Sequence, residues 1–227
     1  MNLLAIETST DFCSVAASRG EALFFRHEPA GRRHAEMILG VVEAVLADAR
    51  LALADIGGIA YGSGPGSFTG LRVACGVTQG LALARDVGVV GVGTLLALAQ
   101  EAAEATSGDC IIACLDAYMG EVYHAAYRNV GGRWEEVCAP GVYKPDSVPA
   151  VSGGGWVGCG NGFAAHGGRV AGRYEGRLSA VRPGLAPTAR AVLRLAGPHF
   201  AAGEAMDAAT AVPVYLRDKV ALKTSER

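Results

Sequence analysis

The sequence predicts an α/β protein in which mixed β-sheets are covered by helices. Short apolar runs bounded by turn residues alternate with longer stretches of helical period. The first three apolar runs follow one another without a helix, which predicts a meander within a mixed sheet. The length of 227 residues allows one large domain or two small ones.

Turn residues and hydrophobic spacing define the elements of the N-terminal half. Polar turns at 7–11 and 19–21 separate the first three strands, and helical spacing begins at Arg33. A glycine-rich loop then opens a second helix. In order, we expect strands at 3–6, 12–18 and 22–27, a helix at 33–50, a strand at 56–61, a helix at 69–85, a strand at 87–92 and a helix at 95–104.

A second unit is expected after the polar stretch 106–109. Residues 112–123 can be laid over Leu3 and its successors at an offset of 109, because in both copies four apolar residues end in an acid, Glu7 or Asp116. The identities are few, so two unrelated hairpins remain an alternative at this point. If the repeat is real, each half places a carboxylate at a hairpin tip, and two similar halves face each other across a cleft.

The C-terminal part is less regular. We expect a hairpin at 131–132, a short strand at 156–159, a helix at 189–196 and an extended tail at 212–217, whereas the last ten residues are polar and are expected to fray. The resulting domain prediction is 1–105 and 106–227, with a tail that can pack back on the first domain.

Composition and charge exclude several classes of protein. A chain with 51% hydrophobic and 19% charged residues is not disordered. The net charge of −2 leaves no excess of cations, so tight binding to RNA by this chain alone is not expected. Six cysteines without a CxxC pair indicate a reducing compartment. No apolar run approaches the 18 residues that a membrane-spanning helix needs. We therefore expect a cytoplasmic protein without membrane contact.

The stretch 62–72 is the most informative part of the chain. Its glycines, including Gly64 and Gly66, allow a tight turn with exposed N–H groups, and Ser67 or Thr69 can cap the following helix. Such an N-terminus attracts anions, and Arg72 adds a cation one turn in. It is not a P-loop, because all three lysines lie far away in the sequence. A capped turn without a ligand is an equally weighted alternative.

Residues for catalysis or metal binding are not evident. The five histidines contain no HExxH or HxxxH pair, and neither GxSxG nor SxxK occurs. We therefore predict no metal site and no catalytic residue in this chain.

The helix at 33–50 carries more apolar residues than packing on one sheet requires. The next helix is rich in small residues, and together the two can form a flat apolar surface of the kind that marks a partner. The alternative is that other parts of the same chain cover both helices. The residues assigned to this partner surface are His34, Met37, Ile38, Val41, Val45, Ala74 and Val77.

Four segments point to a known family: LLAIETST at the start, AYGSGPGSFTGLRVACGVTQGLALA, LDAYMGEVY and PVYLR. With them the chain closely resembles the bacterial TsaB family, also called YeaZ, over essentially its whole length. The resemblance implies the actin-like fold of sugar kinases and acetate kinase, with two related domains, and so favours the repeat.

The resemblance also implies a function. The TsaB family looks like a degenerate relative of TsaD. TsaD is the subunit that transfers a threonylcarbamoyl group to adenosine 37 of tRNAs that read codons starting with A. TsaD holds its metal through HxxxH, whereas here His34 is followed four residues later by Ile38. The resemblance therefore implies a non-catalytic scaffold that pairs with TsaD through its N-terminal helices and is joined by TsaE, an ATPase. It also implies that the chain forms homodimers in the absence of TsaD and contacts tRNA only as part of the complex.

Nucleotide binding by this chain is expected to be weak or absent. In active actin-like ATPases two carboxylates at the hairpin tips organise Mg²⁺, and Glu7 and Asp116 stand at these tips. The first tip offers the hydroxyls of Thr8, Ser9 and Thr10 but no lysine. The site is thus predicted to be vestigial, with Glu7 and Asp116 capping turns; a small-molecule kinase or ATPase is the alternative, and a glycoprotease-like peptidase has no supporting residues.

Overall fold

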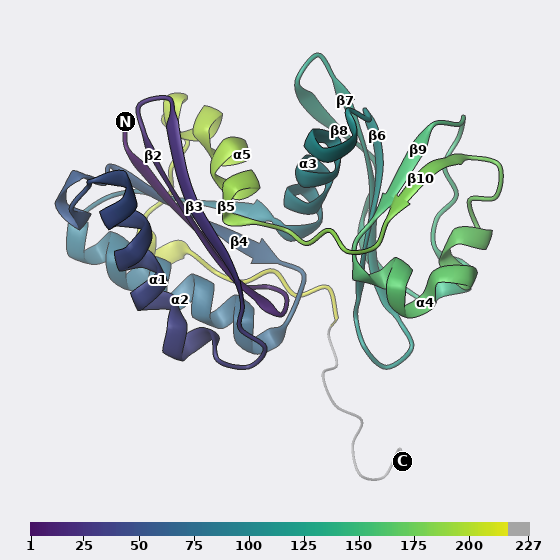
Figure 1. The fold of residues 1–227 in the computed structure, drawn as a ribbon, viewed down its shortest axis with the longest axis horizontal. Helices are drawn as coiled ribbons and strands as arrows, with labels where there is room; N and C mark the ends of the chain where they lie inside the picture. The colour runs from purple at the N-terminus through teal and green to yellow at the C-terminus, as the bar shows by residue number, and fades with distance from the viewer. Residues whose placement is uncertain (218–227) are drawn as a thin grey trace, which may run out of the picture.

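The chain folds into two five-stranded mixed β-sheets flanked by helices (Figure 1). The structure is a computed structural model and describes residues 1–217. The prediction that the last ten residues fray lies outside the described residues. The strands of the first sheet are β1 (Leu3–Glu7), β2 (Phe12–Arg19), β3 (Ala22–Pro29), β4 (Gly58–Gly64) and β5 (Val89–Gly93); those of the second are β6 (Cys110–Asp116), β7 (Val122–Val130), β8 (Arg133–Tyr143), β9 (Trp156–Cys159) and β10 (Leu178–Arg182).

The two sheets have the same topology. Their strand orders are β3-β2-β1-β4-β5 and β8-β7-β6-β9-β10, with the first three strands in each case antiparallel and the last two parallel to the central one. Glu7 and Asp116 occupy the same place, as the last residues of the central strands β1 and β6. The predicted duplication is therefore confirmed.

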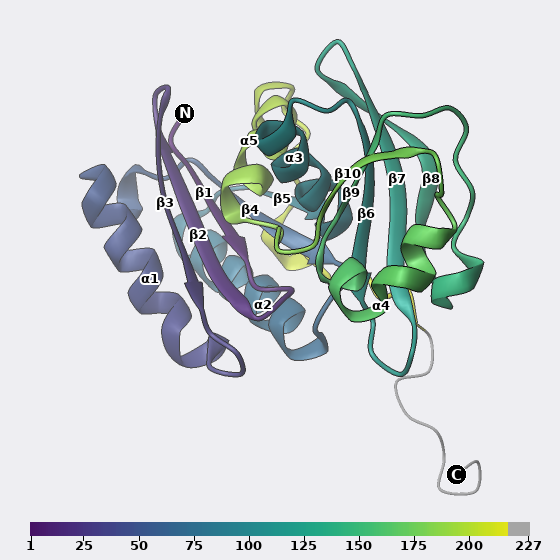
Figure 2. The same cartoon turned by 45° about the vertical axis from the view of Figure 1, so that its right-hand side comes forward.

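Helices cover both faces of each sheet. On the first sheet, α1 (His34–Ala49) and α2 (Phe68–Arg85) pack on one face and α5 (Ala189–Ala201) on the other. On the second, α3 (Thr94–Thr106) and α4 (Asn161–Gly172) take opposite faces. Figures 1 and 2 show α3 and α5 side by side between the sheets. Since α5 follows the second sheet in sequence, the chain returns to the first sheet; the division into 1–105 and 106–227 stays a prediction.

The hairpin predicted at 131–132 joins β7 to β8, whereas the sequence did not predict α4 or β10. α4 contains four glycines, which are poor helix formers. Tertiary packing stabilises it instead, because Phe163 is buried against the second sheet and a Cβ at Gly160 or Gly162 would overlap Cys114 of β6. These glycines therefore allow the helix to approach the sheet closely. Within the described residues, no helix has both the length and the apolar character needed to cross a bilayer.

The core of the second half encloses a histidine. His124 on β7 is fully buried, and its Nε2 lies 2.6 Å from the Tyr174 hydroxyl, which donates to the carbonyl of Pro149. Burial lowers the pKa of His124 from 6.5 to about 4, because the charged imidazolium loses its hydration. The ring is therefore neutral in the folded protein at neutral pH.

This histidine makes stability depend on pH. Between pH 6.5 and about 4, His124 is protonated in the unfolded chain but stays neutral in the folded protein. The free energy of unfolding therefore falls as the pH drops from about 6.5 towards about 4. Between about pH 7.5 and about pH 4.5 we expect this group to cost about 2.5 kcal/mol. Urea unfolding of the wild type and of His124→Gln at both pH values measures it. The variant should lose that part of the pH dependence, and identical pH slopes would contradict the assignment.

Candidate functional site

The turn after β1 is organised by Glu7. Its side chain is buried, and its Oε1 accepts a hydrogen bond from the Ser9 N–H at 2.5 Å. Burial raises the pKa of Glu7, although its contact with Ser9 partly opposes this shift. Among the described residues, neither Glu7 Oε2 nor Ser9 Oγ has a hydrogen-bond partner. The carboxyl thus holds the turn and does not point into open solvent.

The glycine-rich loop after β4 packs directly on this turn. The Ser67 N–H donates to the Ser9 carbonyl at 2.7 Å, and Thr8 Oγ1 donates to the Gly70 carbonyl at 2.7 Å. A Cβ at Gly66 would overlap Ser9. The glycine-rich loop therefore uses its close approach and the Ser67 N–H to hold the β1–β2 turn.

The start of α2 is capped as predicted, and Arg72 contacts two aromatic side chains there. Ser67 Oγ accepts from the Gly70 N–H at 3.3 Å, so Ser67 is the N-cap, whereas Thr69 is exposed in the first turn. The Arg72 guanidinium lies 3.6 Å from the Phe68 ring centroid, and its Nε donates to the Tyr215 hydroxyl at 3.1 Å. That Arg72 adds a cation to an anion site stays a prediction.

The turn after β6 repeats the arrangement around Glu7. Asp116 Oδ1 accepts from the Tyr118 N–H at 3.0 Å, again two residues further along the chain, and lies 3.3 Å from His166 Nε2. The Asp116 N–H in turn donates to Asn161 at the start of α4. Both carboxylates therefore cap turns, as the sequence analysis predicted for Glu7 and Asp116.

The structure brings the two hairpin tips together but leaves little room between them. Thr10 lies beside Ser9 at the first tip, where its carbonyl is 2.8 Å from His34 Nε2. The cavity that the tips share with Gly66, Ser67 and Asp116 has a volume of about 30 Å³. Pockets that enclose drug-sized ligands have about 300 Å³ or more, so a space of this size accommodates water and not a nucleotide. Gly64 ends β4, and a Cβ there would overlap the Val214 carbonyl.

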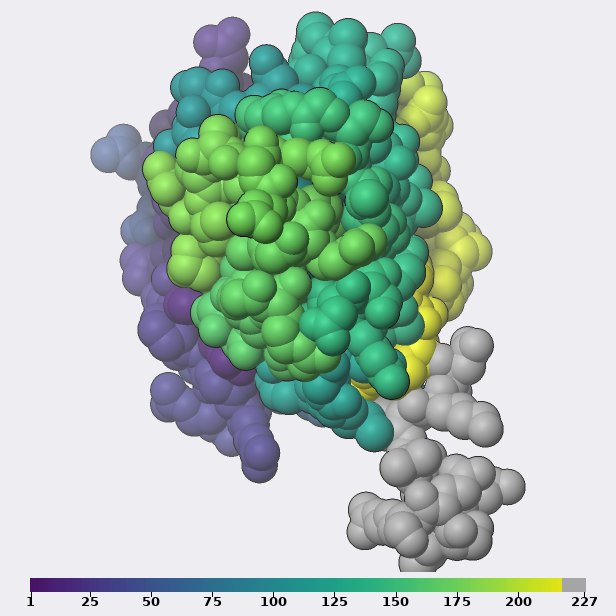
Figure 3. All heavy atoms as spheres, turned by 90° about the vertical axis from the view of Figure 1, so that its right-hand side faces the viewer, coloured from purple at the N-terminus to yellow at the C-terminus, as the bar shows by residue number. Residues whose placement is uncertain are grey.

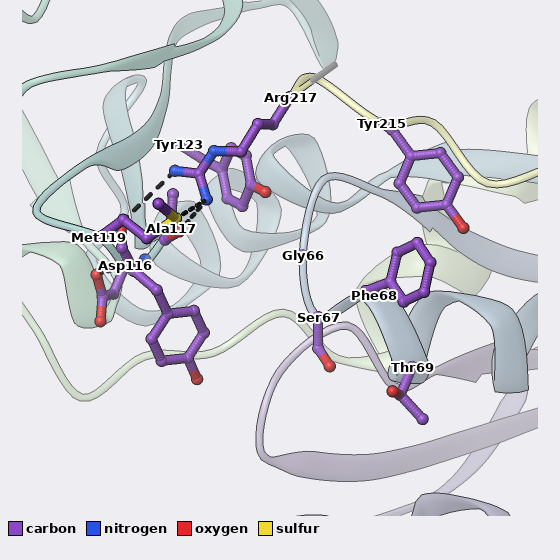
Figure 4. A pocket seen from close by; sticks show the side chains of 11 residues that line it. Gly66, Ser67, Phe68, Thr69, Asp116, Ala117, Met119, Tyr123, Tyr215 and Arg217 are labelled. Atoms are coloured by element: carbon purple, nitrogen blue, oxygen red, sulfur yellow. Dashed lines mark hydrogen bonds between the residues drawn. The ribbon is translucent and has the colours of Figure 1, made fainter. Parts of the chain in front are cut away.

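A larger cavity of about 340 Å³ lies next to these tips (Figure 4). Aromatic side chains from three separate segments line it: Phe68 at the start of α2, Tyr118 and Tyr123 around the β6–β7 turn, and Tyr215 near the C-terminus. Four predicted site residues, Gly66, Ser67, Thr69 and Asp116, also line this cavity. Sequence reasoning missed its aromatic lining, because only folding places residues about 50 and 100 positions apart beside each other. The DAYMGEVY segment was the available signal, since it contributes Asp116 to Met119 and Tyr123.

The predicted partner surface is wrong in most of its residues. Ile38, Val41 and Val45 belong to the side of α1 that packs on the first sheet. Ala74 of α2 lies in the same core, and His34 is buried too. The four of them on α1 recur every three or four residues, and such a stripe faces one side. The alternative, that the same chain covers them, is correct for these positions.

An exposed apolar surface nevertheless exists between α1 and α2. Leu39 keeps 54% of its surface exposed, and Met37 and Val77 are half-buried, so the last two predicted residues stay available. Gly76 and Gly80 on α2 are exposed and have open space around them. A groove of about 390 Å³ runs between the helices, lined by Leu39, Val42, Glu43, Leu46, Ala47, Leu51, Leu53 and Leu81. We call this exposed area the α1–α2 surface.

Within residues 1–217, no group of three or more His, Cys, Asp or Glu side chains is placed to hold a metal ion. The prediction that the chain has no metal site and no catalytic residue stays a prediction.

Comparison with known proteins identifies the family. A family model described as TsaD, tRNA N6-adenosine threonylcarbamoyltransferase, matches residues 27–156. The tRNA threonylcarbamoyladenosine biosynthesis protein TsaB of Escherichia coli K12 is 38% identical over 98% of this chain and 97% of its own length. This chain belongs to the TsaB family. The Haemophilus influenzae TsaB is 34% identical over 98% of this chain and 96% of its own length.

Solved structures of the TsaB family agree with the fold. YeaZ from Pseudomonas aeruginosa has a TM-score of 0.87 at 37% identity and covers 95% of this chain and 99% of its own. A second structure from that organism, described as an uncharacterized protein with similarity to peptidase YEAZ, has a TM-score of 0.88 at the same identity and coverage. The predicted actin-like, duplicated α/β fold is thereby confirmed.

The buried Glu7 gives a prediction about stability. A carboxyl whose pKa is raised by burial stabilises the fold while it is protonated, and this contribution is lost as the pH rises above its ordinary value of 4.5. Glu7→Gln keeps an oxygen acceptor for the Ser9 N–H and carries no charge, so we expect the variant to be more stable than the wild type at neutral and alkaline pH. Urea unfolding across the pH range measures the difference. Glu36→Gln, at an exposed position of α1, is the control, and an unchanged pH slope in Glu7→Gln would contradict the prediction.

Proposed function

We propose that this chain is the scaffold and activating subunit for threonylcarbamoyl transfer to adenosine 37 of tRNAs that read codons starting with A. Identity of 38% to a TsaB over 98% of the chain carries the proposal. A role in the biosynthesis of threonylcarbamoyladenosine in tRNA follows from this family membership. The small space between the hairpin tips and the absence of an HxxxH pair in the sequence support a non-catalytic role.

The proposed partner is TsaD, bound through the α1–α2 surface. Leu39 and Val77 supply apolar contacts, while Gly76 and Gly80 let a partner helix approach closely. The same surface would form a homodimer when TsaD is absent, and TsaE would join the heterodimer as the ATPase. The net charge of −2 supports contact with tRNA through the complex and not through this chain alone. We place the complex in the cytoplasm.

The proposal is tested by copurification and by a modification assay. Tagged chain should retain TsaD, and TsaD with TsaE should modify tRNA faster when the chain is added. The chain alone should leave tRNA unmodified. Modified tRNA produced by the isolated chain would contradict the scaffold role. A TsaD activity that does not change when the chain is added would contradict it too.

The alternative function, a small-molecule kinase or ATPase, has its own test. Titration calorimetry with ATP and Mg²⁺ should give no stoichiometric micromolar signal, because the space between the hairpin tips is about 30 Å³. A micromolar signal that Glu7→Ala abolishes would favour the alternative.

A further inference from the structure

The described end of the chain runs along the first half before it reaches the second. After the turn at Ala208–Thr210, the Ala211 carbonyl accepts a hydrogen bond from Gln79 of α2 at 2.9 Å. The Tyr61 hydroxyl of β4 donates to the Val212 carbonyl at 3.2 Å and accepts from the Val212 N–H at 3.1 Å. Side chains of two elements of the first half thus hold the start of this segment.

The next residues continue along the end of β4 and the start of α2. The Val214 N–H donates to the Ser63 carbonyl at 2.7 Å. The Tyr215 ring lies 5.5 Å from that of Phe68, and its hydroxyl accepts from Arg72. The segment was predicted to be extended, and these contacts fasten it to the first half without making it a strand of the sheet.

Arg217 then crosses to the second half. Its guanidinium donates to the carbonyls of Ala117 at 3.0 Å and Tyr118 at 3.5 Å, and it forms an ion pair with Glu121. All three acceptors belong to the β6–β7 turn. Most of the Arg217 side chain is shielded from solvent, which strengthens these charged hydrogen bonds relative to an exposed pair.

We propose that residues 211–217 form a strap that fixes the second half against the first, with Arg217 as the latch on the β6–β7 turn. The strap passes over the larger cavity, to which Tyr215 and Arg217 both contribute (Figure 4). Figure 3, which views the second half from outside, shows the yellow C-terminal segment along one edge of that half. The strap therefore forms part of the wall of this cavity. This inference is independent of the proposed partner.

Hydrogen exchange on the full chain tests the latch. Within the β6–β7 turn, the Ala117 N–H donates to the Glu121 carbonyl and the Glu121 N–H donates to the Tyr118 carbonyl. In Arg217→Met we expect these two amides to exchange about tenfold faster, because the turn loses its charged hydrogen bonds. Arg182→Met is the matched control, since the Arg182 side chain bonds only to its own neighbour Val181 among the described residues.

A double-mutant cycle separates the latch from a general loss of stability. Glu121→Gln should accelerate the same amides, and the double variant Glu121→Gln with Arg217→Met should add little to either single change. Unchanged exchange in the turn would overturn the proposal. Faster exchange spread evenly over both halves would also overturn it, because that pattern indicates global destabilisation.

Discussion

Gly70→Ala is expected to lower the free energy of unfolding by about 4 kcal/mol. A Cβ at this position would overlap the Thr8 carbonyl oxygen, which belongs to backbone and not to a movable side chain. Neither segment can retreat easily, because Thr8 Oγ1 donates to the Gly70 carbonyl and Ser67 N–H donates to Ser9. Equilibrium unfolding in urea measures the loss as a lower transition midpoint.

Gly76→Ala is the matched control on the same helix. A Cβ at Gly76 would meet no atom within 4 Å, and alanine has a higher helix propensity than glycine. We expect this variant to be more stable than the wild type by about 1 kcal/mol. If Gly70→Ala proved as benign as Gly76→Ala, the close contact between the glycine-rich loop and the β1–β2 turn would be wrong.

Leu39→Glu is expected to weaken pairing with TsaD by about 100-fold or more and to abolish activation in the modification assay. More than half of the Leu39 surface is exposed in the isolated chain, so glutamate there is tolerated by the monomer. In the proposed complex the same carboxylate would be buried among apolar groups. Calorimetric titration of TsaD into the variant measures the loss of affinity.

Two further variants control this experiment. Val130→Glu makes the same kind of change at a residue that is 50% exposed in the second half, and it should leave pairing unaffected. Val45→Glu places the charge in the core under α1, where we expect unfolding of the monomer. Normal TsaD binding by Leu39→Glu would show that the α1–α2 surface is not the partner surface.

Local patterns account for most of what the sequence predicted correctly. The strands at the start, the helices at 33–50 and 69–85 and the Ser67 cap depend on residues close together in the chain. The duplication was also visible, because Glu7 and Asp116 end equivalent apolar runs. In contrast, the glycine-rich α4 depends on its fit against β6, and that contact has no local signal.

The amino-acid sequence by itself determined the order of strands and helices, the repeated hairpins with their terminal carboxylates and the family. Tertiary structure alone decided which stripe of α1 faces its own sheet and which remains exposed, since an apolar helix offers several stripes and the sheet selects one. It alone also decided that Ser9 fills the glycine-rich loop and that Arg217 reaches Glu121. The physical reason is that these contacts join residues about 60 to 100 positions apart, and their geometry exists only after the chain has packed.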